Sequence, residues 1–228
     1  MEQAVFFDFD GVIVDSEPLH YQAYQEILAP MGMGFPWEDY MAVYIGFDDR
    51  EVFGRLFGQR GRAPDAGDLH DLMGRKAAAF LRIVRQSPPA VYPGVRALVE
   101  GLRGRVPLGL CTGALPGDIE PILSAIGLDT AFDVRVTAAD VHASKPDPAS
   151  YRLARERLEA RHPERRFPAE RCVAIEDTPA GIEAAAGAGL RVLAVATTHP
   201  RSALRRAARV VDSLTEVAAD DVLKLGHG

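Results

Sequence analysis

Five short apolar runs, none alternating with polar residues, constrain the fold of this 228-residue chain more than any other feature. Strands that are buried on both faces have this pattern, because each side chain meets a covering helix. The runs span residues 4–7, 107–112, 134–137, 172–175 and 191–196. They predict a parallel sheet covered by helices, which is a doubly wound (Rossmann-like) α/β core.

Helical patterns separate these runs along the second part of the chain. They span residues 95–104, 118–126, 148–161, 179–187 and 214–225. Asp147-Pro148 and Thr178-Pro179 each combine a capping residue with a proline at the first helical position, which is a start signal for a helix. Strand and helix therefore alternate, as a doubly wound sheet requires.

Residues 16–90 have a different pattern. Apolar and aromatic residues recur there at helical spacing, and proline and glycine divide the segment into short helices. We therefore expect two domains. Residues 1–15 and 91–228 form the α/β core, and residues 16–90 form an α-helical domain inserted after the first strand.

Composition excludes several classes of protein. Lys and Arg number 26 against 32 Asp and Glu, a net charge of −6, which argues against nucleic acid or an anionic membrane as the main partner. No apolar run approaches the roughly 20 residues of a membrane helix, and the first residues lack a signal-peptide pattern. Cys111 and Cys172 lie inside apolar runs, so we expect buried, reduced thiols. A cytoplasmic monomer is the expectation.

The first apolar run ends in Asp8-Phe9-Asp10-Gly11. Acids at positions i and i+2 of a strand point to one face, and the carboxyl end of a strand is where open α/β sheets bind ligands. Two neighbouring carboxylates repel each other unless a cation separates them, and Mg²⁺ prefers oxygen ligands. A solvated acidic turn remains the alternative for this pattern alone.

Three other strand ends carry candidate site residues. Glu176-Asp177 is a second acidic pair, which a helix N-terminus would favour even without a metal. Lys145, in Ser-Lys-Pro-Asp-Pro, lies in a stiff turn that can aim its ammonium at carboxylates and phosphate, although single lysines are usually surface residues. Thr112-Gly113 offers a hydroxyl and backbone N–H groups to a phosphate.

The order of these motifs, D-x-D-G, T-G, K-P and E-D, resembles that of the haloacid dehalogenase superfamily over essentially the whole chain. The segments DFDGVIVDSEPLH, SKPDP and IEDTPAGIEAAAGAG are similar to subfamily I, in its phosphoglycolate-phosphatase-like, CbbY-like and β-phosphoglucomutase-like branch. The resemblance implies a phosphohydrolase whose helical insert is a cap domain. It also implies Mg²⁺ as cofactor and a small phosphorylated metabolite as substrate.

Carried onto this sequence, the resemblance makes Asp8 the nucleophile that forms an aspartyl-phosphate. Asp10 is the general acid and base, and Lys145 stabilises charge in the transition state. The implied metal ligands are Asp8, Asp10, Glu176 and Asp177. The phosphate-binding residues are Thr112, Gly113 and Lys145. The candidate substrate contacts in the cap are His20, Arg50 and Lys76.

Two alternatives stay open at this stage. A β-phosphoglucomutase-type mutase would pass the phosphoryl group to a second hydroxyl, but the T-G-A motif and the position of Arg50 depart from the pattern of that mutase. A non-enzymatic, receiver-like phosphate-binding module also uses clustered aspartates and a lysine. Such a module is about half this length and has no helical insert after its first strand.

Overall fold

The structure is a computed structural model that describes residues 2–45, 47, 49–61 and 64–227. The chain forms two compact units. The core unit comprises Met1–Asp15 and Ala90–Gly228, and the helical unit comprises Ser16–Pro89. The second segment of the core unit begins at Ala90, one residue before the boundary expected from the sequence.

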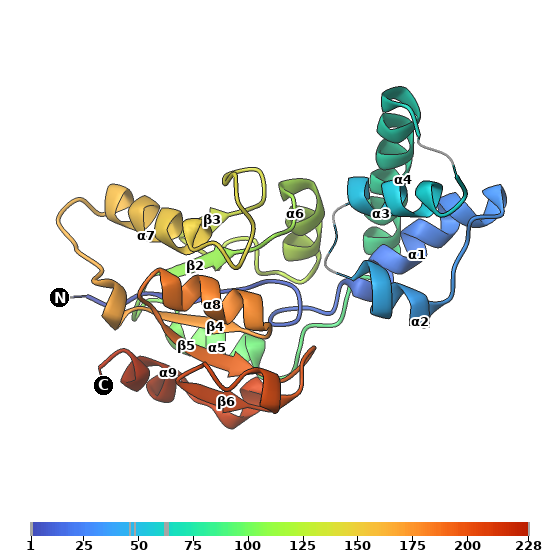
Figure 1. The fold of residues 1–228 in the computed structure, drawn as a ribbon. Coiled ribbons are helices and arrows are strands. Elements are labelled where there is room, and N and C mark those ends of the chain that lie inside the picture. Colours follow the sequence, from blue (N-terminus) through green and yellow to red (C-terminus); the bar gives the residue numbers. More distant parts are fainter. Residues whose placement is uncertain (1, 46, 48, 62–63, 228) are drawn as a thin grey trace. The chain divides into compact units, whose positions relative to one another are not determined.

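Within the described residues, the core unit contains a six-stranded sheet in the order β3-β2-β1-β4-β5-β6, with every neighbouring pair parallel (Figure 1). The strands are β1 (Val5–Phe7), β2 (Leu108–Cys111), β3 (Val134–Val136), β4 (Val173–Glu176), β5 (Arg191–Val195) and β6 (Arg209–Val211). The predicted doubly wound α/β fold is confirmed. The sequence patterns did not predict β6, which is a three-residue, half-exposed edge strand.

Helices cover both faces of this sheet (Figure 1). They are α5 (Val95–Leu102), α6 (Pro116–Ala125), α7 (Ala149–Arg161), α8 (Pro179–Gly187) and α9 (Ala219–Leu225), with short 3₁₀ turns at Ala169–Arg171, Arg201–Ala203 and Leu214–Glu216. Helix α7 contacts α8, β2 and β3, whereas α5 contacts α9. No helix in the described part of the chain is both long and apolar enough to cross a membrane.

One predicted helix, residues 214–225, is wrong in its extent. Its residues form a 3₁₀ turn and then α9, because Val217 and Ala218 are extended. Two separate caps cause the break: Ser213 and Glu216 cap the turn, and Asp221 accepts a hydrogen bond from Ala218 N at 3.0 Å.

The two predicted helix starts lie at or next to their expected positions. Thr178 accepts a hydrogen bond from Gly181 N at 3.0 Å, and α8 begins at Pro179. Helix α7 begins at Ala149, one residue later than expected, because Pro148 is itself the N-cap. Asp147 accepts a hydrogen bond from Ala149 N at 2.9 Å. The turn that carries Lys145 thus runs directly into α7.

The core of this unit lies between the sheet and its helices. Phe6 is fully buried and meets Tyr151 edge to face, with ring centroids 6.4 Å apart. Burying one such aromatic side chain contributes about 1.5–3 kcal/mol. Cys111 and Cys172 are buried free thiols, as predicted.

The described residues of the helical unit form helices and no strand. They are α1 (Glu17–Leu28), α2 (Trp37–Asp39), α3 (Asp49–Gly58) and α4 (Ala66–Gln86), with a 3₁₀ turn at Ala29–Met31 and a π-helical turn at Tyr40–Tyr44. Helix α1 packs against α4. Tyr24 and Phe53 lie edge to face between the helices, with centroids 5.6 Å apart, so this unit has an apolar core of its own.

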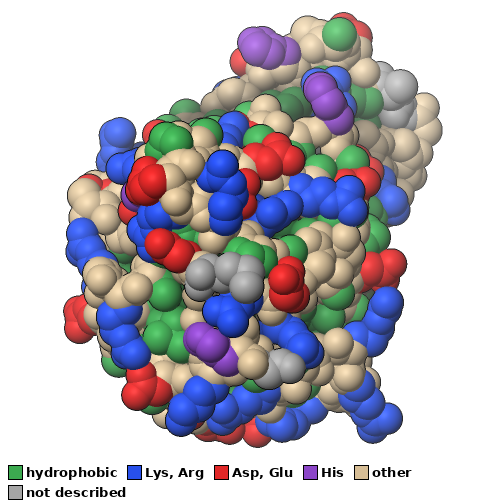
Figure 2. Space-filling view, turned by 90° about the vertical axis from the view of Figure 1, so that its left-hand side faces the viewer, with side chains coloured by type: hydrophobic (Ala, Val, Ile, Leu, Met, Phe, Trp, Pro, Cys, Tyr) green, Lys and Arg blue, Asp and Glu red, His purple; other side chains and the backbone are tan. Residues whose placement is uncertain are grey.

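Charges of opposite sign are interspersed on the surface of the core unit. Figure 2 shows basic and acidic side chains intermingled over one face. Ion pairs account for part of this pattern, among them Arg157–Asp140 at 2.5 Å and Arg105–Asp220 at 2.5 Å. Such exposed pairs contribute about 0–1 kcal/mol each, so their main effect is local charge compensation.

Candidate active site

The sheet register brings the first and last sequence motifs together. Phe7 pairs with Leu110 on one side and with Ile175 on the other, so the next residue, Asp8, lies beside the ends of β2 and β4. Asp8 N donates a hydrogen bond to Ile175 O at 3.0 Å. The strand order reverses between β1 and β4, and the carboxyl ends of strands at such a switch point are the usual ligand site of doubly wound sheets.

Lys145 joins the two acidic strand ends. Its Nζ lies 2.8 Å from Asp8 Oδ1, 2.6 Å from Glu176 Oε1 and 3.1 Å from Cys111 O. An ammonium has three hydrogens, and these three acceptors can use all of them. Burial would lower the pKa of Lys145, but the charges of Asp8 and Glu176 outweigh it and hold that pKa above its ordinary value. Lys145 is therefore a fixed, fully charged group.

The Glu176 carboxylate is enclosed by protein donors. Tyr151 donates its hydroxyl hydrogen to Glu176 Oε1 at 2.5 Å, the same oxygen that Lys145 contacts. Gly181 lets α8 approach closely, because a Cβ there would lie 1.9 Å from Glu176 Oε2. Burial, followed by the charge of Asp8, raises the pKa of Glu176. This carboxylate is fully buried and already hydrogen-bonded, so it anchors Lys145.

Asp177 has one engaged and one unengaged oxygen. Thr198 donates its hydroxyl hydrogen to Oδ2, while Oδ1 is buried and has no hydrogen-bond partner among the described atoms. Burial and the neighbouring Asp8 raise the pKa of Asp177. A buried acceptor oxygen without a partner lowers the stability of the fold unless a cation or a hydrogen-bond donor contacts it.

The donor set fits a divalent cation. Carboxylate oxygens of Asp8, Glu176 and Asp177 lie within 4.8 Å of one another, and one ammonium cannot compensate three carboxylates. Hard cations such as Mg²⁺ take oxygen ligands of this kind. Asp10 is not a member of this carboxylate group among the described residues; its backbone bridges to Val14.

The loop after β2 is the predicted phosphate-binding segment. Thr112 is buried and accepts a hydrogen bond from Ala114 N at 3.0 Å, which closes a tight turn. Gly113 is exposed, and a Cβ there would meet no atom within 4 Å. Cys111, the last residue of β2, also gives its carbonyl to Lys145. The loop thus begins beside the ammonium and continues into open space.

In the helical unit, two of the three predicted substrate contacts lie together. Lys76 Nζ is 2.9 Å from His20 Nδ1 and 2.8 Å from Asp49 Oδ1, and Tyr24 donates to the same Asp49 oxygen at 2.6 Å. Lys76 is only 2% exposed. Burial, and then the charge of Lys76, lowers the pKa of His20, so the imidazole is neutral and accepts a hydrogen from the ammonium.

Arg50 has a different environment. It is exposed in the first turn of α3, next to the buried network but on the solvent side of the helix. The three predicted residues therefore divide into a hydrogen-bonded pair inside the helical unit, with Lys76 buried and His20 half-buried, and one exposed cation.

The sequence did not predict that Tyr151, Thr198, Asp49 and Tyr24 take part in these networks. Thr198 lies shortly after the end of β5, so the strand-end rule that found Asp8 would have pointed to it. Tyr151 lies on α7, shortly after the Lys145 turn, but its sequence pattern is that of an ordinary core aromatic. Asp49 is recognisable only through its buried partner Lys76.

Comparisons with known proteins agree with this arrangement. The family model of the haloacid dehalogenase-like hydrolases matches residues 2–189. The protein CbbY from Cereibacter sphaeroides is 30% identical over 224 residues, which cover 95% of this chain and 94% of CbbY. The validoxylamine A 7'-phosphate phosphatase of Streptomyces hygroscopicus subsp. limoneus is 30% identical over 218 residues, covering 95% of this chain and 96% of that enzyme.

A solved structure has the same fold. The crystal structure of a CbbY variant from Rhodobacter sphaeroides, in complex with xylulose-(1,5)bisphosphate, superposes with a TM-score of 0.80 at 28% identity. The superposition covers 95% of this chain and 96% of that one. The family model and the whole-length relatives agree with the four motifs at the switch point of the sheet. The chain thus belongs to the haloacid dehalogenase-like hydrolase family, in the branch of CbbY and the phosphoglycolate phosphatases, and is a phosphohydrolase.

Proposed function

We propose that this protein is a Mg²⁺-dependent phosphatase of a small phosphorylated metabolite, a sugar phosphate or a phosphoglycolate-like acid. The observation that carries the proposal is the contact of Lys145 with Asp8 and Glu176 beside the unengaged oxygen of Asp177. This arrangement holds a nucleophilic carboxylate, a fixed ammonium and an oxygen ligand at one strand switch point. Those are the parts that phosphoryl transfer to a carboxylate needs.

In the proposed reaction Asp8 attacks phosphorus, and an aspartyl-phosphate forms as the bond to the leaving oxygen breaks. Asp10 gives a proton to that oxygen and then takes one from the water that hydrolyses the intermediate. Lys145 stabilises the negative charge on the transferring group. The Thr112 hydroxyl and the Gly113 backbone bind its remaining oxygens, because Gly113 borders open space.

The residues that would hold Mg²⁺ are Asp8 and Asp177, through their carboxylates, and Asp10, through its backbone carbonyl, with Glu176 next to them. When bound, the ion supplies positive charge that offsets the repulsion between Asp8 and the phosphate dianion. The buried, unpartnered Oδ1 of Asp177 supports this assignment. Glu176 differs, since Lys145 and Tyr151 both contact its Oε1, which supports a role in holding Lys145.

The substrate class follows from the relatives. One relative is named as a phosphatase of validoxylamine A 7'-phosphate, and the solved CbbY structure holds xylulose-(1,5)bisphosphate. We assign substrate selection to the helical unit acting as the cap, with Arg50 as its exposed cation. His20 and Lys76 remain candidates, although both are engaged with each other.

A screen of phosphorylated metabolites tests the proposal. Release of inorganic phosphate is measured with Mg²⁺ and with EDTA for sugar phosphates, sugar bisphosphates and 2-phosphoglycolate. We expect turnover of a small group of these compounds and loss of turnover in EDTA that added Mg²⁺ restores. Turnover that survives EDTA would contradict the metal assignment, and no turnover of any compound would contradict the function.

The comparisons do not favour the mutase alternative, because a relative matched over nearly its whole length at 30% identity is named as a phosphatase. A direct assay separates the two reactions. With β-glucose 1-phosphate, a phosphatase releases phosphate, whereas a mutase forms glucose 6-phosphate with little free phosphate. The hydrolase family likewise favours an enzyme over a receiver-like binding module.

A further inference from the structure

The segment that follows β5 forms two side-chain contacts with the site loops. Thr197 donates its hydroxyl hydrogen to Gly11 O, in the loop that carries Asp8 and Asp10. Thr198 donates its own to Asp177 Oδ2, at the end of β4. Neighbouring residues of one segment thus contact both acidic motifs.

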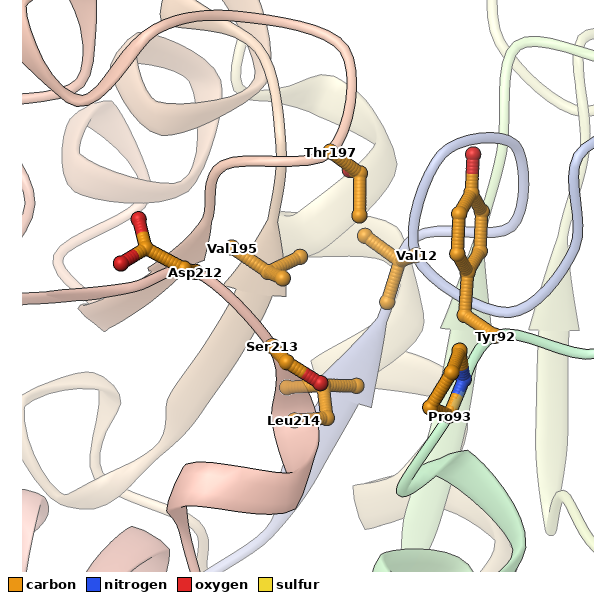
Figure 3. Close-up of a pocket in the computed structure, with 8 residues that line it drawn as sticks. All are labelled: Val12, Tyr92, Pro93, Val195, Thr197, Asp212, Ser213 and Leu214. Atoms are coloured by element: carbon orange, nitrogen blue, oxygen red, sulfur yellow. The ribbon is translucent and has the colours of Figure 1, made fainter.

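Figure 3 shows how the first of these residues is placed. The side chains of Thr197 and Val12 lie next to each other on a small cavity of about 250 Å³ that Tyr92 also lines. The Thr197 side chain thus contacts the loop of the first motif at Gly11 O and lies beside Val12. The hydrogen bond to Gly11 O limits the positions that the next residue, Thr198, can take.

The Thr198 hydroxyl lies within hydrogen-bonding distance of both Asp177 and His199. Its hydroxyl has a single hydrogen, and the acceptors on Asp177 are the carboxylate Oδ2 and, at 3.4 Å, the backbone carbonyl. His199 Nδ1 lies 3.0 Å from the same hydroxyl oxygen. In the tautomer that carries its hydrogen on Nδ1, His199 donates to the Thr198 hydroxyl oxygen, and the hydroxyl gives its own hydrogen to Asp177 Oδ2. This contact directs the hydroxyl hydrogen toward Asp177.

These contacts restrict the rotation of the Asp177 carboxylate group. Oδ2 accepts the hydrogen bond from Thr198, and Oδ1 is buried with no hydrogen-bond partner in the part of the chain that the structure describes. Gly11 closes the other side, because a Cβ at that position would lie 2.0 Å from Asp177 Oδ2 and 2.9 Å from Thr198 Cγ2. The carboxylate cannot rotate freely without losing the Thr198 bond or meeting the Gly11 backbone.

We propose that Thr198 is a positioning residue that orients Asp177 so that its free oxygen binds the divalent cation. The inference rests on the proposed function in one respect, the cation at Asp177. Donors that orient metal ligands contribute about 10–100-fold to metal affinity. Thr198 itself is exposed, so its replacement by valine changes the hydroxyl and leaves the core of the unit intact.

The test is cation binding by the whole protein in the absence of any phosphate compound, with Mn²⁺ as the probe and the free ion counted by electron paramagnetic resonance. The variants are Thr198→Val, which removes the hydroxyl, and Thr198→Ser, which keeps it. Thr215→Val is the matched control, since the Thr215 hydroxyl bonds Ser213 and not a carboxylate. Thermal unfolding in EDTA checks that each variant is folded.

We expect Thr198→Val to raise the dissociation constant for Mn²⁺ about tenfold, and Thr198→Ser and Thr215→Val to stay within about twofold of the parent. The inference is overturned if Thr198→Val binds as tightly as the parent, if Thr198→Ser is as weak as Thr198→Val, or if the parent binds no Mn²⁺. If the expected pattern appears but no phosphomonoester is hydrolysed, the proposed function alone fails.

Discussion

The Lys145 ammonium and the Tyr151 hydroxyl contact one and the same oxygen of Glu176, at 2.6 Å and 2.5 Å. Lys145 also lies 5.3 Å from the centre of the Tyr151 ring, so the three groups form one buried unit. A buried carboxylate needs such donors, because an unpaired charge in the interior is strongly unfavourable. The proposed catalytic lysine is therefore held by residues that would not themselves touch a substrate.

Replacement of Lys145 should be destabilising as well as inactivating. Lys145→Met leaves Glu176 and Asp8 without their cation, and we expect the free energy of unfolding to fall by about 3 kcal/mol in urea titrations with EDTA. Phosphate release should fall about a hundredfold or more. Lys224→Met, at an exposed lysine of the same unit, is the control and should change neither quantity appreciably. Unchanged stability of Lys145→Met would contradict the buried ion pair.

Tyr151→Phe should cost stability through one hydrogen bond to a charged group, about 2 kcal/mol in urea titrations. Tyr21→Phe is the control, because the Tyr21 hydroxyl bonds the neutral carbonyl of Phe35 at 3.0 Å, and it should cost about 1 kcal/mol or less. A double-mutant cycle with Glu176→Gln should give a coupling energy of about 1 kcal/mol. Additive effects would show that the two side chains do not interact.

Asp8→Asn should abolish turnover and keep the fold. The amide cannot form an acyl-phosphate, so we expect phosphate release to fall about a thousandfold or more, with an unchanged circular dichroism spectrum. Asp15→Asn, an exposed aspartate shortly after the motif, should retain parent activity. Labelled phosphate should remain on the acid-quenched parent and not on Asp8→Asn. Retained turnover in Asp8→Asn would refute the nucleophile assignment.

Asp49→Asn should destabilise the helical unit. Lys76 is nearly inaccessible and Asp49 is its carboxylate partner at 2.8 Å, so the amide leaves a buried ammonium without an opposite charge. We expect a loss of about 3 kcal/mol in the free energy of unfolding. Asp71→Asn, which breaks only the exposed contact with Arg75 at 3.5 Å, should cost less than about 0.5 kcal/mol. Equal effects would show that the buried pair contributes no more than a surface pair.

The Asp140–Arg157 pair predicts a pH dependence. The hydrogen bond from Arg157, with those from the Thr137 amide and hydroxyl, lowers the pKa of Asp140 to about 2. A lowered folded-state pKa contributes stability above the unfolded value of about 3.9, and this contribution is lost as the pH falls toward 2. Asp140→Asn should therefore cost about 1 kcal/mol at pH 7 and progressively less below about pH 4. Urea titrations between pH 7 and 3 measure the difference, and a constant difference would contradict the pairing.

The fold was predictable because its strands are buried on both faces. The runs that predicted β1 to β5 are continuous and apolar, a pattern that few other structures produce. Strand β6 was missed because an edge strand needs fewer apolar residues: Arg209 and Val210 are both half-exposed. The prediction of one helix over residues 214–225 was wrong for a local reason, since Ser213 caps the 3₁₀ turn and Asp221 separately caps the start of α9 at Ala218.

The residues at the site were predictable where chemistry and strand ends coincide. Asp8, Lys145, Glu176 and Asp177 meet at the carboxyl ends of the central strands β1 and β4, as the motif order indicated. The supporting residues were not predictable, because nothing in a sequence tells a tyrosine that bonds a buried carboxylate from a tyrosine that fills a core. Lys76 shows the same limit: its pattern is that of an exposed helical lysine, and only the packing of α1 against α4 reveals that it is enclosed.

The central place of β1 in the sheet has a consequence for truncated forms of the chain. Its two neighbours are β2 and β4, so one edge of the strand that leads to Asp8 stays open until Val173–Glu176 has joined it. A fragment ending before β4 exposes the unpaired amides and carbonyls of an apolar strand, a known template for association between chains. Along this sequence, β1 therefore gains its second neighbour only after β2 and β3.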